Sequence, residues 1–450
     1  MKKYITGILL TACLLAGCTQ NSSTKGELPT LETGIASAPT SLTEEYTRDE
    51  PTLTVQEALS GGVQFSLYED GRLVLSGGNI MENITDTRVF KENVGSITIL
   101  EFGDGVEEIG EKALAGAEKI QKINFGSSVK RVGYYAFSNC TGLTGISFGD
   151  GLTTIEDFAF SGCSKLTDVN LDKNIKQIGG YAFSGCTGLK NAVLGNNIQE
   201  LGSNIFDGCT GLTYLRIQCN ITSSGLSGTP KLEYLVLEDS VENLCARAFS
   251  GCPELKSITF SMNLKSIGDY AFADCTKLKE MALPESLEEL GNYVFNDCTG
   301  LTTVQIGSNV QNMGQLVFSG CTGLKTIVCS SSIGNSSFKD CAALTTLTLS
   351  GNVRAIGDNA FSGCKAMTEV VLPDGVESIG TRAFYECAGL RKLSLPGTLQ
   401  SVGAEFFYGT TELKDLIFTG TNNQWNKITF AKNWNKNSIG AITWISKFGN

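Results

Sequence analysis

The sequence contains no histidine among its 450 residues. This absence excludes Ser-His-Asp and Cys-His nucleophile pairs, histidine general bases and every zinc site that uses an imidazole ligand. No C-x-x-C pair occurs, so the spacing typical of structural zinc and iron–sulfur centres is missing too. The sequence also lacks a G-K-[ST] phosphate loop and a D-x-D-x-D-G calcium loop. We therefore expect no catalytic residues, no metal and no cofactor.

Clusters of lysine and arginine are also absent, and the formal net charge is −11. Binding to nucleic acid requires a basic surface that neutralises phosphates. A nucleic-acid partner is therefore not expected, and the excess of acidic residues favours solubility.

The N-terminus reads MKKYITGILLTACLLAGC, with two lysines followed by an apolar run that is short for a bilayer span. We interpret residues 1–17 as a signal peptide. Leu15-Ala16-Gly17-Cys18 resembles the lipobox of bacterial lipoproteins, which implies that Cys18 is lipidated; the alternative is an ordinary secretory signal with an incidental cysteine. Residues 18–52 are rich in Ser, Thr, Pro and Glu and predict a disordered tether, with an end-to-end distance of about 30 Å.

Residues 53–105 have a different pattern, in which apolar and polar residues alternate. Residues 65–68 and 72–75 form two such runs, and Glu69-Asp70-Gly71 lies between them. Asp-Gly between alternating runs is typical of a β-hairpin. We predict a hairpin cap that covers the apolar end of the structure formed by the rest of the chain.

Residues 106–420 repeat one pattern at a step of 23 residues. Each copy reads L-x-x-I-x-L, a turn, V-x-x-I-G and then A-F-x-x-C, as in the copy that begins at Met367. One copy cannot bury its apolar residues alone, so the constant spacing predicts stacked coils. We predict a β-rich repeat solenoid of about fourteen coils, with short strands and helical or 3₁₀ turns. The phenylalanines that mark the repeat are Phe137, Phe160, Phe183, Phe206, Phe249, Phe272, Phe295, Phe318, Phe361, Phe384 and Phe407.

Eleven of the 16 cysteines occupy the closing position of successive coils. A secreted protein with many cysteines normally forms disulfides, and stacked neighbours would lie within disulfide reach. However, Ala117, Thr229 and Thr410 stand at the same position, so the repeat does not depend on pairing. We expect a ladder of buried free thiols, with cross-coil disulfides as the alternative.

Two steps of the ladder, Cys209 to Thr229 and Cys321 to Cys341, are 20 residues long. The V-x-x-I-G segment has lost three residues in both, so these two coils should be narrower than the others.

Residues 421–450 leave the repeat and contain Trp425, Trp434 and Trp444. We expect a C-terminal cap in which aromatic side chains cover the last coil. The alternative is an aromatic site that stacks on glycans.

The repeated L-x-x-I-x-L and V-x-x-I-G-x-x-A-F-x-x-C pattern resembles the BspA-like leucine-rich repeats of bacterial surface proteins. The resemblance covers roughly residues 100–420, and the tail that begins Thr419-Gly420-Thr421 resembles segments that flank such repeats. It implies a lipid-anchored adhesion or recognition protein on the cell surface, and the family has no shared catalytic motif to carry over.

The outward strand positions of adjacent coils should line up into one broad surface. Tyr214 and Tyr234 occupy equivalent positions in neighbouring coils, with Arg216 beside them, and tyrosine and arginine are enriched in binding hot spots. We hypothesise that Tyr214, Arg216 and Tyr234 belong to a ligand-binding patch. The alternative is an exposed cross-strand aromatic pair that only stabilises the sheet.

These observations predict a secreted, surface-anchored recognition protein without catalysis that binds a host or neighbour-cell protein through its strand face. The alternative is a lipoprotein that captures glycans or mucins, again without catalysis. An enzyme is the least favoured class, because the repeat pattern is uniform and histidine is absent.

Overall fold

The structure of the protein is a computed structural model. It describes residues 51–450 apart from residues 82, 223–225, 227–228, 436–442 and 447–450, and only the backbone of Thr443–Ser446. The predicted signal peptide, Cys18 and nearly all of the predicted tether lie outside the described residues. None of the helices in the described part of the chain is long and apolar enough to cross a bilayer.

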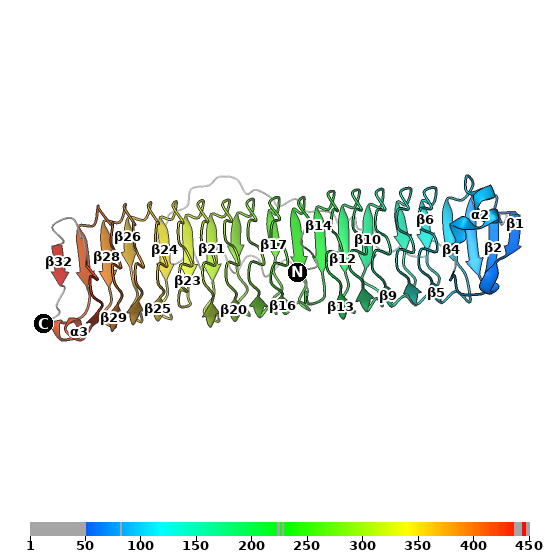
Figure 1. The fold of residues 1–450 in the computed structure, drawn as a ribbon. Coiled ribbons are helices and arrows are strands. Elements are labelled where there is room, and N and C mark those ends of the chain that lie inside the picture. The colour runs from blue at the N-terminus through cyan, green and yellow to red at the C-terminus, as the bar shows by residue number, and fades with distance from the viewer. Residues whose placement is uncertain (1–50, 82, 223–225, 227–228, 436–442, 447–450) are drawn as a thin grey trace, which may run out of the picture. The chain divides into compact units, whose positions relative to one another are not determined.

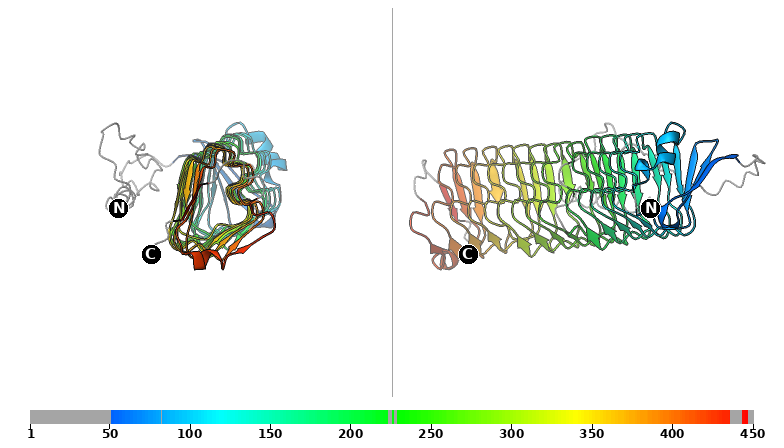
Figure 2. Two further views of the ribbon diagram at one scale, coloured as in Figure 1. Left: turned by 90° about the vertical axis from the view of Figure 1, so that its left-hand side faces the viewer. Right: turned by 45° about the vertical axis from the view of Figure 1, so that its right-hand side comes forward.

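From residue 51 onward the chain forms a β-solenoid of about 15 turns with little helix, which confirms the predicted fold class (Figure 1). Viewed along the stack, successive coils superimpose (Figure 2). Each coil contributes one strand to a first column, where neighbouring strands pair in parallel. The first column consists of β4 (Ile99–Phe102), β6 (Lys122–Asn124), β8 (Gly145–Ser147), β10 (Asp168–Leu171), β12 (Asn191–Leu194), β14 (Tyr214–Ile217), β15 (Tyr234–Leu237), β17 (Ser257–Thr259), β19 (Glu280–Ala282), β21 (Thr303–Ile306), β23 (Thr326–Cys329), β24 (Thr346–Leu349), β26 (Glu369–Val371), β28 (Lys392–Leu395), β30 (Asp415–Phe418) and β32 (Thr443–Ser446).

Most coils add a two-residue strand to a second column, formed by the isoleucine position of V-x-x-I-G and the residue before it, and these strands also pair in parallel. The second column consists of β5 (Glu108–Ile109), β7 (Arg131–Val132), β9 (Thr154–Ile155), β11 (Gln177–Ile178), β13 (Glu200–Leu201), β16 (Asn243–Leu244), β18 (Ser266–Ile267), β20 (Glu289–Leu290), β22 (Asn312–Met313), β25 (Ala355–Ile356), β27 (Ser378–Ile379), β29 (Ser401–Val402) and β31 (Thr429–Phe430).

The core consists of identical side chains stacked on one another, because the register places each coil directly over the last. Phe272, Phe295 and Phe318 are fully buried, and their successive ring centroids lie 5.4 and 5.2 Å apart with nearly parallel planes. Offset-parallel rings at such distances attract one another in addition to burying area. The phenylalanine spacing in the sequence therefore corresponds to two series of packed rings, from Phe137 to Phe206 and from Phe249 to Phe384, with Leu226 at the equivalent position between them.

The A-F-x-x-C segment forms hydrogen-bonded turns and not a continuous helix. Backbone N–H groups bond to the carbonyl three residues earlier, as in Ser138 to Tyr135 and Cys140 to Phe137. The residue two positions before each stacked phenylalanine has a left-handed conformation, for example Phe158 with φ 57°. The residue two positions after each stacked phenylalanine is left-handed as well, for example Gly162 with φ 77°. Two left-handed residues per turn prevent the regular dihedral angles that a helix needs.

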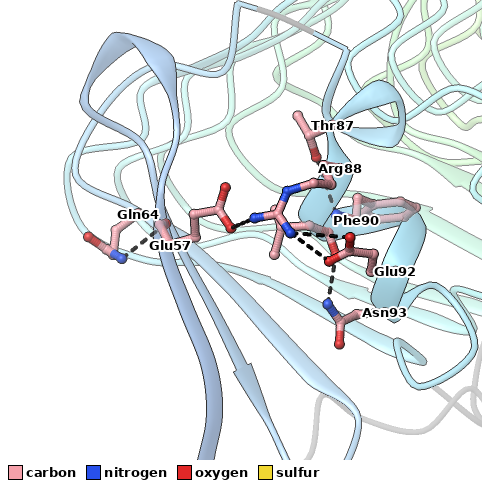
Figure 3. A network of polar contacts seen from close by, with 8 residues as sticks. Glu57, Gln64, Thr87, Arg88, Phe90, Glu92 and Asn93 are labelled. Atoms are coloured by element: carbon pink, nitrogen blue, oxygen red, sulfur yellow. Dashed lines mark hydrogen bonds and ion pairs between the residues drawn. The ribbon is translucent and has the colours of Figure 1, made fainter.

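The N-terminal cap contains the predicted hairpin, formed by β2 (Gln64–Tyr68) and β3 (Arg72–Ser76). A further strand, β1 (Leu53–Ala58), pairs with β2, and β3 pairs in parallel with β4 of the solenoid. The cap also contains the helix α2 (Arg88–Asn93) and the 3₁₀ turns η1 (Ser60–Gly62) and η2 (Ile84–Asp86). Arg88 joins the helix to the edge strand, because its guanidinium contacts Glu57 at 3.4 Å and Glu92 at 3.0 Å (Figure 3).

At the other end, the helix α3 (Asn422–Trp425) begins with a capping box between Thr421 and Gln424. The Trp425 ring lies 5.1 Å from Phe418, and the Trp434 ring lies 4.4 Å from Phe430, measured between centroids. These aromatic side chains cover the last coil. The side chain of Trp444 lies outside the described residues.

Candidate ligand-recognition surface

Tyr214, Arg216 and Tyr234 lie on the outward side of two adjacent strands, β14 and β15. Tyr214 is the register partner of Tyr234, and Arg216 is the register partner of Val236. All four side chains are half-buried, whereas Leu215 between them points into the core. The alternation of side chains in a strand therefore brings the three predicted residues together on one surface.

The charged groups of this surface are paired with one another. Arg216 Nε donates a hydrogen bond to Glu238 Oε1 at 2.7 Å. Lys256 Nζ donates to Glu233 at 2.6 Å and also lies 5.8 Å from the centroid of the Tyr234 ring. Each cation thus has a carboxylate from an adjacent coil, which leaves the surface close to neutral.

The two tyrosines are neighbours without being a stacked pair. Within the described residues, no ring contact between Tyr214 and Tyr234 is found, and neither hydroxyl has a hydrogen-bond partner. The alternative role of an aromatic pair that only stabilises the sheet therefore has no ring contact to support it. Burial raises the pKa of the Tyr214 phenol, and the Arg216 charge opposes this shift.

The cysteine ladder consists of buried free thiols, as the spacing predicted. Nine of the eleven ladder thiols donate to the carbonyl of the phenylalanine one coil earlier, for example Cys298 to Phe272 at 3.2 Å and Cys387 to Phe361 at 3.1 Å. Cys140 donates to the carbonyl of Leu114 instead, and Cys252 pairs with the Thr229 hydroxyl. Burial raises the pKa of the Cys387 thiol to about 12. In the part of the chain that the structure describes, no group of three potential ligands is placed to hold a metal ion.

A profile of the BspA-type leucine-rich repeat region matches the chain over residues 83–213, 219–335 and 331–450, in six copies. Most of the sequence is therefore covered. The chain belongs to the BspA-type leucine-rich repeat family. Leucine-rich repeat solenoids are commonly protein-interaction and surface proteins, because the stacked strands present an extended surface.

Solved BspA-type and other leucine-rich repeat structures resemble this chain. A leucine-rich repeat protein from Bacteroides ovatus is 25% identical with a TM-score of 0.61, over 89% of this chain and 99% of that protein. One from Eubacterium ventriosum is 21% identical with a TM-score of 0.37, over 79% and 94%. A leucine-rich cell surface protein from Faecalibacterium prausnitzii is 18% identical with a TM-score of 0.34, over 85% and 98%. A search of curated proteins found no match.

The BspA-type coils carry a second aromatic feature, away from the strand face, that the sequence reasoning missed. The rings of Tyr135, Phe158 and Tyr181 stack at centroid distances of 4.8 and 5.0 Å on the outside of the turns. Tyr270 and Tyr293 form a similar pair at 4.6 Å. In the sequence this feature is marked by aromatic residues that stand two positions before core phenylalanines, outside the strand positions that the sequence prediction considered.

Proposed function

We propose that this protein is a surface-anchored recognition protein, without catalysis of its own, that binds a protein of a host or neighbouring cell through its strand face. The observation that carries the proposal is the register pairing of Tyr214 with Tyr234 beside Arg216 on an outward surface. Two tyrosines and an arginine at the centre of a neutral patch have the composition of a binding hot spot.

The surrounding residues support this proposal. Internal ion pairs reduce the desolvation that a partner would have to compensate, because each cation keeps its carboxylate when water is expelled. The two free phenol hydroxyls can make hydrogen bonds with the partner. The family's common role in protein interaction is consistent with this surface.

The second short coil supplies a matched control for the test. Thr326 and Thr346 are register partners on β23 and β24, with Val328 beside them, at positions equivalent to Tyr214, Tyr234 and Arg216. We propose replacing each set of three residues by alanine and measuring attachment of bacteria that display the protein to cultured host cells. Attachment should fall at least tenfold for the tyrosine set and little for the threonine set. Equal effects of the two sets would contradict the assignment of the patch.

Surface anchoring through lipidated Cys18 is a separate part of the proposal. The Cys18→Ser variant should be released from the membrane fraction, and protease added to intact cells should remove the wild-type protein. Protection of the wild-type protein from added protease would contradict display on the cell surface.

The alternative is capture of glycans or mucins by a lipoprotein that itself has no catalytic activity. Treating the host cells with protease or with glycosidases before the attachment assay separates the two functions. Loss after protease alone favours a protein ligand, and loss after glycosidases alone favours a glycan.

A further inference from the structure

One position of the repeat carries an aromatic side chain in a single coil. It is the second residue after the isoleucine of the I-G segment, and most coils place a short or polar side chain there. The position is occupied by Glu111, Tyr134, Asp157, Gly180, Ser203, Ala246, Asp269, Asn292, Gln315, Asn335, Asp358, Thr381 and Ala404. Tyr134 is also among the large side chains that are exposed, at 37%.

The Tyr134 ring lies beside the exterior aromatic stack and not within it. Its centroid is 4.3 Å from that of Tyr135 and 6.0 Å from that of Phe158, while Tyr135 and Phe158 are 4.8 Å apart. These distances form a triangle with nearly a right angle at Tyr135. The centroid of Tyr134 therefore lies to the side of the line that joins the centroids of the two stacked rings.

The interplanar angles describe how the Tyr134 ring packs against the rings of Tyr135 and Phe158. The Tyr134 plane makes angles of 81° and 87° with the planes of Tyr135 and Phe158. An edge-to-edge contact cannot be as short as 4.3 Å, because the hydrogen atoms would overlap. Tyr134 therefore packs edge to face against the stack, and 37% of the residue stays exposed to solvent.

Tyr134 packs against rings that are themselves held in place by stacking. Tyr135 and Phe158 are rigid because each is stacked, and Tyr181 continues the stack on the far side of Phe158. Within the described residues, no other ring contacts Tyr134. The result is a partly exposed aromatic ring that packs against an ordered aromatic stack on the exterior of the solenoid.

Polar groups of both signs border this ring. Glu111 and Asp157 occupy the same position one coil before and one coil after Tyr134, at a coil spacing of about 4.8 Å. Lys112 Nζ donates to Glu111 Oε1 at 2.7 Å. Asp157 Oδ1 accepts the N–H of Gly180 at 2.7 Å, and its second carboxylate oxygen has no hydrogen bond in the described structure.

We propose that Tyr134 and its borders form a binding site for a neutral pyranose unit of a glycan. The flat C–H face of a sugar carries a slight positive charge, which the negative face of an aromatic ring attracts. Sugar hydroxyls both donate and accept, so they suit a border that holds carboxylates and an ammonium group. A cationic ligand fits less well, because the Lys112 ammonium lies at the same border.

This site does not depend on the strand-face patch. Tyr134 belongs to the turn after the second column of strands, whereas Tyr214 and Tyr234 belong to the first column. The proposal therefore gives the protein a second, glycan-directed surface and can fail without affecting the protein-binding proposal.

The test uses the full-length protein in a detergent without a sugar headgroup. Cellotetraose, maltotetraose and chitotetraose serve as probes, and binding is measured by calorimetry for the wild type, Tyr134→Ala and Tyr134→Phe. We expect at least one probe to bind, Tyr134→Ala to weaken it about tenfold or more, and Tyr134→Phe to stay within about twofold. Met262→Ala is the control, because this side chain is 64% exposed and belongs to neither proposed site, and it should leave probe binding unchanged.

A second measurement covers the case in which Tyr134→Ala disturbs folding, which circular dichroism detects. The probe should cause a tyrosine difference spectrum in the wild type, and this spectrum should be absent in Tyr134→Phe even though that variant still binds. The proposal is overturned if none of the three sugars binds, if Tyr134→Ala binds as the wild type does, or if Met262→Ala weakens binding as much as Tyr134→Ala does. Binding of a tetralysine peptide but of no sugar would reassign the site to cations.

Discussion

Removal of one ring from the phenylalanine stack tests whether the stacked core holds the solenoid together. Phe295 lies at its middle, fully buried, with Phe272 and Phe318 stacked on its two faces. Phe→Ala in a core costs about 3–5 kcal/mol, and the cost is highest where the surroundings cannot collapse. The register fixes both neighbouring rings, so we expect Phe295→Ala to lower the free energy of unfolding by about 4–5 kcal/mol.

The assay combines urea unfolding, followed by circular dichroism, with amide hydrogen exchange. Each coil contacts mainly its neighbours, so the loss of protection should be concentrated in β19, β21 and β23 and be smaller at the two ends. Val371→Ala on the strand face is the control, because this side chain is 56% exposed and its loss should change stability by less than about 0.5 kcal/mol.

Two results would refute this reasoning. A loss below about 1 kcal/mol would mean that the core relaxes around the missing ring, contrary to fixed stacking. An equal loss of protection along the entire solenoid would mean that the coils do not behave as neighbours coupled in one dimension.

Three further predictions follow from single contacts. Of the fourteen free cysteines in the described part of the chain, only Cys245 is not buried, so among these fourteen iodoacetamide should label Cys245 alone in the native protein and all of them after denaturation. Burial raises the pKa of Cys245, so its labelling at pH 8 should be slower than that of free cysteine and should increase with pH; a second labelled site by mass spectrometry would contradict this. Thr421→Ala removes the capping box with Gln424 and should cost about 1 kcal/mol, seen as faster hydrogen exchange in α3; unchanged exchange would speak against it. Asp358→Ala removes the acceptor of the Thr381 N–H at 2.6 Å and should lower the free energy of urea unfolding by about 1 kcal/mol. Asp358→Asn keeps an acceptor oxygen and should leave the free energy of unfolding unchanged; equal values for the two variants would show that water replaces the carboxylate.

The regular part of the fold was predictable because one physical requirement repeats in every coil. The aliphatic residues, the phenylalanine and the cysteine of each coil recur at fixed spacing and can be buried together only if the coils stack in register. Phe295, Cys298 and their equivalents could therefore be placed from the sequence. The facing of Tyr214 and Tyr234 followed from the same register. A role in binding does not follow from the register and is a proposal, because spacing determines where a side chain lies and not whether a ligand meets it.

The irregular parts had no repeat to identify them. β1 and α2 belong to the cap, where each element occurs once and depends on tertiary contacts such as that between Arg88 and Glu57. The orientation of Tyr134 was equally hidden, because it depends on the left-handed backbone of Tyr135, which turns that ring onto Phe158. A sequence pattern contains the identity of these residues but not the angle between their rings.

The two short coils show why the recognition surface survives a change in repeat length. Ile221 and Ile333 still form the parallel bridges of the second column. The three missing residues of each short coil are therefore missing from the turn before its bridge. Buried Cys219 and Ser331 lie in these shortened turns. A deletion inside a first-column strand would instead have moved its side chains by an odd number of positions and exchanged inward for outward residues. Because the deletion lies in the turn, Tyr214 remains opposite Tyr234 and Thr326 remains opposite Thr346. Coil length can therefore vary in the turn between the two columns of strands while the first column stays continuous.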